Sequence, residues 1–138
     1  MKEIDDLAFF RCMNLQSITL LGSPKLGGGV FSFCHSLRSV EFADGITELP
    51  ESTFGYCSSL TSVRLPKGLS RIGRFALGCC SSLESIHLPE GLEEIFEDAF
   101  TNCRSLKTIA LPKSLSKICG AAFRRCKSLA KIEIDKDN

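Results

Sequence analysis

Eight cysteines are the residues of this 138-residue chain with the clearest capacity for chemistry, as metal ligands, nucleophiles or disulfide partners. Six of them recur at intervals of 22, 23, 23, 23 and 23 residues: Cys12, Cys34, Cys57, Cys80, Cys103 and Cys126. A zinc site would need Cys-x-x-Cys pairs that converge on one point, and the sequence contains no such pair. A catalytic thiolate would need a nearby base and some exposure to solvent. The regular spacing instead indicates a structural column.

Disulfides within this series are unfavourable if the six cysteines face inward and stack. Their Cβ vectors would then be parallel and about one coil apart, beyond the Cβ separation of about 3.8 Å that a disulfide adopts. We therefore predict a column of small, buried, reduced thiols. Cys79 and Cys119 fall outside the series, and Cys79 is expected to be the more reactive of the two.

No combination of residues in the sequence indicates an active site. The two histidines, His35 and His87, occupy different positions of the repeat, and neither has an Asp or Ser at a spacing typical of a triad. The glycines at 27–29 are not followed by the Lys-Ser or Lys-Thr of a phosphate-binding loop. We predict that the chain is not an enzyme, and we expect no cofactor and no metal site.

The charge balance and hydropathy exclude two further classes of partner. The chain has 17 Lys and Arg against 16 Asp and Glu, so no strong field exists to attract nucleic acid. No run approaches the roughly 18 apolar residues that would span a bilayer, and the opening MKEIDD is acidic where a signal peptide is basic. We expect one domain over residues 1–138, without nucleic-acid binding or membrane insertion.

Apolar residues accompany every cysteine of the series at fixed offsets. Three, six and eight positions after the cysteine stand, for example, Leu60, Val63 and Leu65. In SLTSVRLP at 59–66, the alternation predicts a short strand that ends at Pro66. In EDAFTNC at 97–103, the spacing predicts a single helical or 3₁₀ turn. Because so short a unit cannot bury its apolar face alone, the units must stack as a solenoid, with a parallel sheet on one side and helical turns on the other.

The unit LPEGLEEIFEDAFTNCRSLKTIALP at 88–112 resembles the BspA-like leucine-rich repeat, whose pattern reads LPxxLxxIxxxAFxxCxxLxxIxLP. The resemblance implies a right-handed α/β solenoid of six repeats, and the departures from the pattern, such as Thr53 in place of the alanine, do not threaten that fold. The repeat bounds are expected at 4–25, 26–48, 49–71, 72–94, 95–117 and 118–138. Members of this family are mostly adhesion and recognition modules of bacteria and protists, often on the cell surface. The resemblance therefore favours an extracellular or cell-surface location, which nothing else in the sequence decides.

Outward residues of the predicted strands are the first candidates for contact with a protein partner. On the concave strand face they are Arg38, Glu41, Arg64, Glu84, His87, Lys107 and Glu133. The chain has no Trp, and no aromatic residue lies in these columns, so the usual anchors of a tight interface are absent there. Phe33 and Tyr56 instead form a possible patch on the flank of the predicted helical turns. The leading hypothesis is a protein-interaction or adhesion module; the alternative is a structural or assembly segment.

One column of charge alternates in sign through all six repeats, nine positions before each cysteine. Its members are Glu3, Lys25, Glu48, Arg71, Glu94 and Lys117. We interpret it as a ladder of surface pairs that fixes the stacking, because alternating charges cancel the field that a partner would feel. The pattern begins at Ile4 and stops at Ile134, so both end faces are expected to be open and apolar. This predicts either a longer array or end-to-end self-association.

Overall fold

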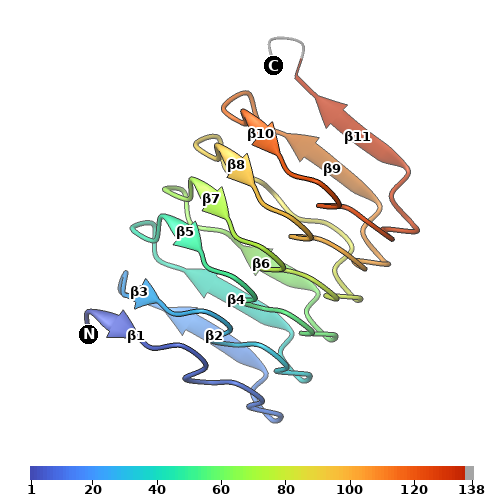
Figure 1. Cartoon of the computed structure of the whole chain (residues 1–138). Coiled ribbons are helices and arrows are strands. Elements are labelled where there is room, and N and C mark those ends of the chain that lie inside the picture. Colours follow the sequence, from blue (N-terminus) through green and yellow to red (C-terminus); the bar gives the residue numbers. More distant parts are fainter. Residues whose placement is uncertain (136–138) are drawn as a thin grey trace.

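The chain forms a stack of six coils, each of which crosses from one face of the stack to the other and back (Figure 1). The computed structural model describes residues 1–135. One face carries two-residue strands: β1 (Glu3–Ile4), β3 (Lys25–Leu26), β5 (Glu48–Leu49), β7 (Arg71–Ile72), β8 (Glu94–Ile95) and β10 (Lys117–Ile118). The other face carries longer strands: β2 (Ser17–Leu20), β4 (Ser39–Phe42), β6 (Ser62–Arg64), β9 (Thr108–Leu111) and β11 (Lys131–Ile134). All of these strands pair in parallel, so the fold is a parallel β-solenoid.

The longer strands follow the apolar alternation of the sequence. In β2, β4 and β6 the residues Ile18, Val40 and Val63 lie in register and are buried, while the residues on either side of each point outward. The sheet is interrupted in the fourth repeat, since residues 85–88 form no strand. The prediction of one strand per repeat is therefore wrong at this position. The alternation there is intact, with Ile86 and Leu88 buried, because it fixes which side chains face inward and does not fix backbone pairing.

The predicted helical turn, and with it the α/β class, is wrong: the described residues contain no helix. Each coil instead places two residues at positive φ, five and one positions before the repeat cysteine. They are Leu7 and Arg11, Gly29 and Phe33, Ser52 and Tyr56, Phe75 and Cys79, Asp98 and Asn102, and Ala121 and Arg125. A residue in this left-handed region cannot continue a right-handed helix, so each one ends the turn that precedes it.

The backbone N–H groups of this segment alternate between two kinds of acceptor. In the third coil, Gly55 and Cys57 donate to carbonyls three residues earlier in the same coil, those of Ser52 and Phe54. The intervening N–H of Tyr56 donates to the next coil, to the carbonyl of Gly78 at 2.8 Å. The helix-like spacing of the sequence therefore reflects a chain of tight turns. The side chains predicted to share one face, Ala99, Phe100 and Cys103, are all buried as expected.

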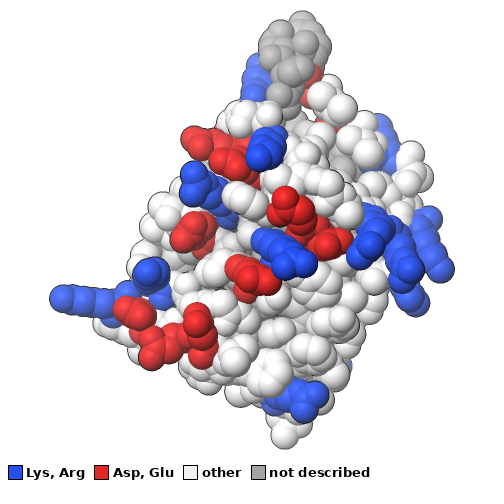
Figure 2. Space-filling model, viewed as in Figure 1, with Lys and Arg blue, Asp and Glu red and all other residues white. Residues whose placement is uncertain are grey.

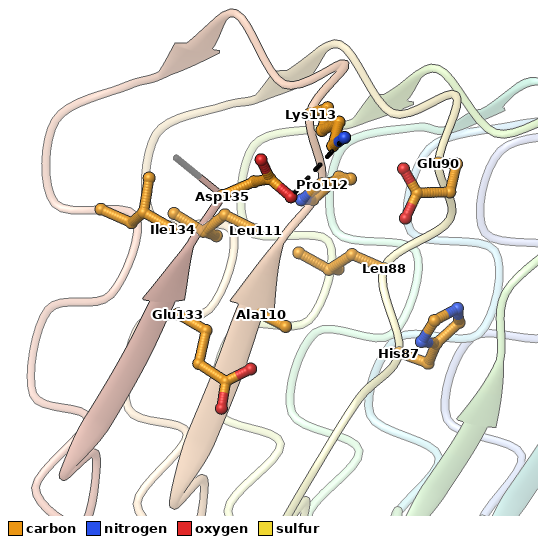
Figure 3. Close-up of a pocket in the computed structure, with 10 residues that line it drawn as sticks. All are labelled: His87, Leu88, Glu90, Ala110, Leu111, Pro112, Lys113, Glu133, Ile134 and Asp135. Atoms are coloured by element: carbon orange, nitrogen blue, oxygen red, sulfur yellow. Dashed lines mark ion pairs between the residues drawn. The ribbon is translucent and has the colours of Figure 1, made fainter. Parts of the chain in front are cut away.

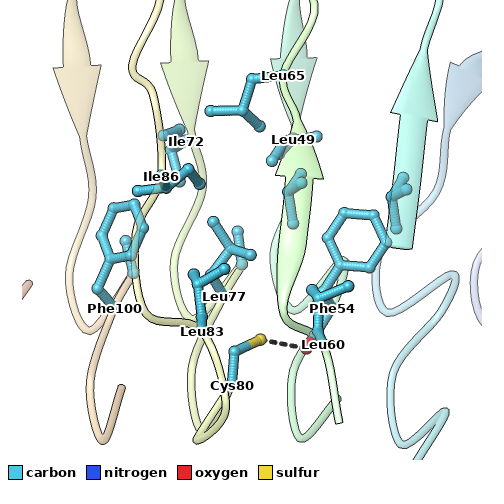
Figure 4. Close-up of a cluster of buried hydrophobic side chains, with 14 of the residues drawn as sticks. Leu49, Phe54, Leu60, Leu65, Ile72, Leu77, Cys80, Leu83, Ile86 and Phe100 are labelled. Atoms are coloured by element: carbon cyan, nitrogen blue, oxygen red, sulfur yellow. Dashed lines mark hydrogen bonds between the residues drawn. The ribbon is translucent and has the colours of Figure 1, made fainter. Parts of the chain in front are cut away.

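The core is one continuous column between the two faces (Figure 4). Phenylalanine rings stack from coil to coil, with Phe31 lying 5.5 Å from Phe9 and 5.6 Å from Phe54 between ring centroids. Leu60 and Leu83 are fully buried beside them. Because burying one such side chain stabilises a fold by about 1.5–3 kcal/mol, stacking is the main source of stability for every coil.

Cys34, Cys57, Cys80 and Cys103 are buried as predicted, whereas Cys12 and Cys126 in the two end coils are only half-buried, and all six cysteines of the column are free. Each thiol from the second coil onward also donates a hydrogen bond to the preceding coil, which the sequence did not indicate. The donor and acceptor pairs are Cys34 to Phe9, Cys57 to Phe31, Cys80 to Phe54, Cys103 to Leu77 and Cys126 to Phe100, with Sγ–O distances of 3.1–3.3 Å. Burial raises the pKa of Cys57 from 9.0 to about 12. From Cys34 onward burial raises the pKa of each thiol of the column, so these protonated thiols join adjacent coils.

The alternating charges lie on the two-residue strands, which the sequence did not predict. Arg71 is in register with Glu48 on one side and Glu94 on the other, and its Nε lies 3.8 Å from Glu94 Oε1. Glu3 is likewise in register with Lys25. Figure 2 shows Lys and Arg side chains alternating with Asp and Glu over this face. Among the described residues, Arg71 and Glu94 are the only neighbours in the column within 4.0 Å, and β3 does not pair with β5, so the structure supports cross-coil pairing for part of the column.

Reversing Arg71 to Glu tests whether this column stabilises the stack. The variant places like charges on three successive coils, because residues 48 and 94 are both glutamate. We expect the free energy of unfolding to fall by about 1 kcal/mol at low salt and by less at high salt. Urea denaturation measures the change. Arg38→Glu, whose column neighbours Gln16 and Thr61 are uncharged, is the matched control for net charge. Equal losses in the two variants would contradict the role of the column.

Alkaline pH should destabilise the fold through the buried thiols. Between 9.0 and about 12 the Cys57 thiol is deprotonated in the unfolded chain and protonated in the folded chain. Its contribution is complete below pH 9 and is lost as pH rises towards 12. Under reducing conditions, we expect the free energy of unfolding of Cys57→Ala to fall less steeply above pH 9 than that of wild type. The two slopes should differ by up to about 1.4 kcal/mol per pH unit. Parallel pH profiles for wild type and variant would contradict this expectation.

Candidate binding surfaces

The strand face, formed by the outward side chains of β2, β4, β6, β9 and β11, of the residue directly before each of them and of the segment 84–88, carries all the predicted contact residues. The seven are Arg38, Glu41, Arg64, Glu84, His87, Lys107 and Glu133, and every one of them is exposed. They occupy two columns, four and seven positions after the repeat cysteine, and each column lies on one side because equivalent residues of stacked coils point in the same direction. The fold thus brings together residues that are up to 95 positions apart in the chain.

Ion pairs between adjacent coils occupy most of the charges on the strand face. Arg64 Nη1 lies 3.4 Å from Glu41 Oε1, and Lys107 Nζ lies 2.9 Å from Glu84 Oε2. Glu133 pairs with Lys131 at 2.7 Å, and the hydrogen bond from that ammonium lowers the pKa of the Glu133 carboxyl. These exposed pairs contribute little to stability, because solvent and salt screen them. They give the face a patterned but nearly neutral surface.

The interruption in the fourth repeat opens the centre of the strand face. Within the described part of the chain, no backbone hydrogen bond joins residues 85–88 to either neighbouring coil. His87 lines a hollow of about 440 Å³ towards β6, shared with Arg64 and Lys67. On its other side it lines a second hollow of about 320 Å³, shared with Lys113 and Glu133 (Figure 3). The exposed imidazole and the unpaired backbone therefore lie between two open hollows.

A second surface is the turn edge, made of the residues from two before to two after each repeat cysteine. None of its residues is Asp or Glu, although the chain contains 16 of them. Its charged residues are Arg11, Arg104, Arg124, Arg125 and Lys127. Figure 2 shows a group of Lys and Arg side chains at one edge of the last coils. Among the described residues, Arg124 pairs with Asp98 at 3.3 Å, whereas Arg104, Arg125 and Lys127 make no ion pair.

Aromatic rings occupy the other half of the turn edge. Phe33 stacks on Tyr56 with ring centroids 4.4 Å apart, and Phe10 meets Phe33 edge-on at 5.6 Å. The guanidinium carbon of Arg11 lies 5.5 Å from the ring centroids of both phenylalanines. The sequence had indicated Phe33 and Tyr56 as a patch. The position of Arg11 was missed, although its place directly before the first repeat cysteine puts it in the same column as those two rings.

The described residues include no group of three or more His, Cys, Asp or Glu side chains placed to hold a metal ion. His35 lies at the turn edge, 5.9 Å from the ring of Phe33, and His87 lies on the strand face. No helix in this part of the chain has the length and apolarity needed to cross a membrane.

Comparison with known proteins identifies the family. The profile described as BspA type leucine rich repeat region matches residues 2–130 in six copies, so the chain belongs to this family. The match also confirms the six repeats predicted from the cysteine spacing. Proteins of this fold generally serve as non-enzymatic scaffolds for protein contacts. No match is found among curated proteins.

Three solved structures illustrate the relationship. A leucine-rich repeat protein from Bacteroides ovatus is 37% identical with a TM-score of 0.90, over 99% of this chain and 38% of that one. The T. pallidum leucine rich repeat protein is 29% identical with a TM-score of 0.74, and the match covers 96% of this chain and 51% of that one. A leucine rich cell surface protein from Faecalibacterium prausnitzii is 29% identical with a TM-score of 0.83, and the match covers 86% of this chain and 32% of that one. The chain thus spans about a third to a half of the length of these proteins.

Proposed function

We propose that the chain is a protein-interaction or adhesion module that binds a protein partner through the strand face and catalyses no reaction. The observation that carries this proposal is the opening at residues 85–88, where His87 and unpaired backbone groups lie between two hollows. Unpaired N–H and C=O groups on a sheet are available for hydrogen bonds with an incoming chain. The seven polar side chains around them would supply specificity.

The electrostatics of the strand face suit a protein partner better than a polyanion. Its positive and negative side chains alternate from coil to coil, as in Glu41 with Arg64 and Glu84 with Lys107. A nucleic acid would meet as much repulsion as attraction on such a surface. A folded protein with a complementary pattern could exchange these weak pairs for pairs across the interface. The relative from Faecalibacterium prausnitzii is described as a cell surface protein, which supports an extracellular setting for this contact.

A second role, as a structural or assembly segment, is favoured by the two end coils. The ring of Phe9 in the first coil is 43% exposed, whereas the equivalent Phe54 in the third coil is fully buried. Ile118 in the last coil is 42% exposed, whereas Ile95 in the coil before it is fully buried. Apolar side chains open on one side of a solenoid are suited to stacking against a further coil.

Affinity capture with three forms of the chain tests the strand-face proposal. Arg64→Ala/His87→Ala/Lys107→Ala removes side chains from the strand face, and Arg104→Ala/Arg125→Ala/Lys127→Ala removes the same number from the turn edge. We expect proteins captured from the source organism or its attachment surface by wild type to be reduced at least tenfold with the first variant. The second variant should capture them normally. Loss with the turn-edge variant alone, or capture by both variants, would contradict binding through the strand face.

A further inference from the structure

The backbone hydrogen bonds that join coils outside the strand ladders have a direction, and the direction differs between parts of the coil. At the turn edge the earlier coil donates to the later one, as in Tyr56 N–H to the carbonyl of Gly78. Parallel strands exchange hydrogen bonds in both directions, but the bonds that flank them run from the later coil to the earlier one, as in Gly73 N–H to the carbonyl of Leu49 at 2.7 Å. Each coil therefore presents two unlike surfaces, one towards the first coil and one towards the last.

The two ends of the described structure display these unlike surfaces without partners. In the last coil the N–H groups of Phe123 and Arg125 have no acceptor, and the carbonyl of Ile118 has no donor, within the described residues. In the first coil the carbonyls of Ala8 and Phe10 have no donor. The N–H of Asp5 likewise has no acceptor there. Donors at one end thus correspond in position to acceptors at the other.

The positions correspond to bonds that the inner coils already make. Phe100 donates to the carbonyl of Ala122 at 2.7 Å, and Phe123 and Ala8 hold the same two places in the repeat. Cys119 donates to the carbonyl of Ile95 at 2.8 Å, as Asp5 of a second copy would to Ile118. A second copy that follows the last coil in register would therefore repeat a junction present five times within the chain.

Side chains at the two ends match in the same register. The ring of Phe123 stacks on Phe100 at 5.1 Å and has its other side turned towards the open end, as Phe9 has at the opposite end. Cys126 donates to the carbonyl of Phe100, and Cys12 of a second copy would meet the equivalent carbonyl of Phe123. Ile118 and Ile132 of the last coil are also exposed. These groups are the apolar part of the contact.

The charge column selects the order in which copies can follow one another. It ends on Lys117 in the last coil and begins on Glu3 in the first. A second copy placed after the last coil would set Glu3 against Lys117 and so continue the alternation. A two-fold arrangement that overlaid this column would place Lys117 against Lys117, or Glu3 against Glu3, and would leave the N–H groups of Phe123 and Arg125 without the carbonyl acceptors that the first coil supplies. Both the hydrogen bonds and the charges therefore favour one polarity.

On the basis of the assembly role proposed above, we infer that the chain associates head to tail with a second copy. The last coil of one copy receives the first coil of the next, with Lys117 against Glu3 and Phe123 against Phe9. Such a contact is heterologous, because the two surfaces differ, so it can repeat to form an open filament. Ile18 of the first coil is only 9% exposed and contributes little to this contact.

Charge reversal and mixing test the polarity. Lys117→Glu and Glu3→Lys should each weaken self-association roughly tenfold at low salt, measured by sedimentation velocity over increasing concentration. An equimolar mixture should regain wild-type association, because every junction between unlike copies again pairs Glu with Lys. Glu48→Lys, in the same column but inside the stack, is the matched control and should leave association unchanged. Circular dichroism checks that each variant is folded.

The possible outcomes separate the inference from the assembly role. A closed dimer that does not grow with concentration, or association that the reversals do not weaken, would overturn the head-to-tail contact and leave an assembly role standing. A monomer at millimolar concentration would overturn both. If the variants do not fold, carbodiimide cross-linking of the wild-type chain is the alternative readout. It should join Lys117 to Glu3, which are too far apart along the stack to be linked within one copy, and absence of this link in an associated sample would overturn the inference.

Discussion

Along the turn edge, backbone hydrogen bonds alternate, with one inside the coil and the next to a neighbouring coil. This alternation is the constraint from which the other features follow. It requires residues with positive φ at two places in every repeat, and eleven of the twelve are not glycine. Each such residue costs of order 1 kcal/mol or more. The cost is offset only when a neighbouring coil accepts the intervening N–H and buries the adjacent Phe or Leu. A single coil is therefore unstable, and stability belongs to the stack.

The same constraint separates the residues that stack from those that can vary. Inward positions such as Phe54, Cys57 and Leu60 are fixed by contact with the coils on both sides. Outward positions on the strands meet only solvent or the charge on the next coil, as Arg64 meets Glu41. A surface of this kind can change its pattern without cost to the core, which makes the strand face suited to recognition. At residues 85–88 the regular pairing of strands on that face is interrupted.

The sequence predicted the period, the six repeats, most of the inward residues and the cross-coil pair of Arg71 with Glu94, because side-chain periodicity records which groups are buried and which lie in one column. It did not predict the left-handed residues, since the side chains at these positions range from Leu7 and Phe33 to Asp98 and show no glycine pattern. Helical spacing of Ala99, Phe100 and Cys103 was consistent with either a helix or a series of turns. The thiol hydrogen bonds and the gap in the fourth repeat depend on backbone positions that residue types do not encode.

Amide hydrogen exchange, measured by NMR at a concentration where the protein is monomeric, tests the central role of the alternating hydrogen bonds most directly. The N–H groups of Phe54 and Tyr56, which donate to the next coil, should exchange only through global unfolding. Those of Phe123 and Arg125, at the same repeat positions but without an acceptor in the described structure, should exchange orders of magnitude faster. Equal protection of the two pairs would contradict the account, because it would mean that hydrogen bonds within a coil are sufficient to hold the turn edge.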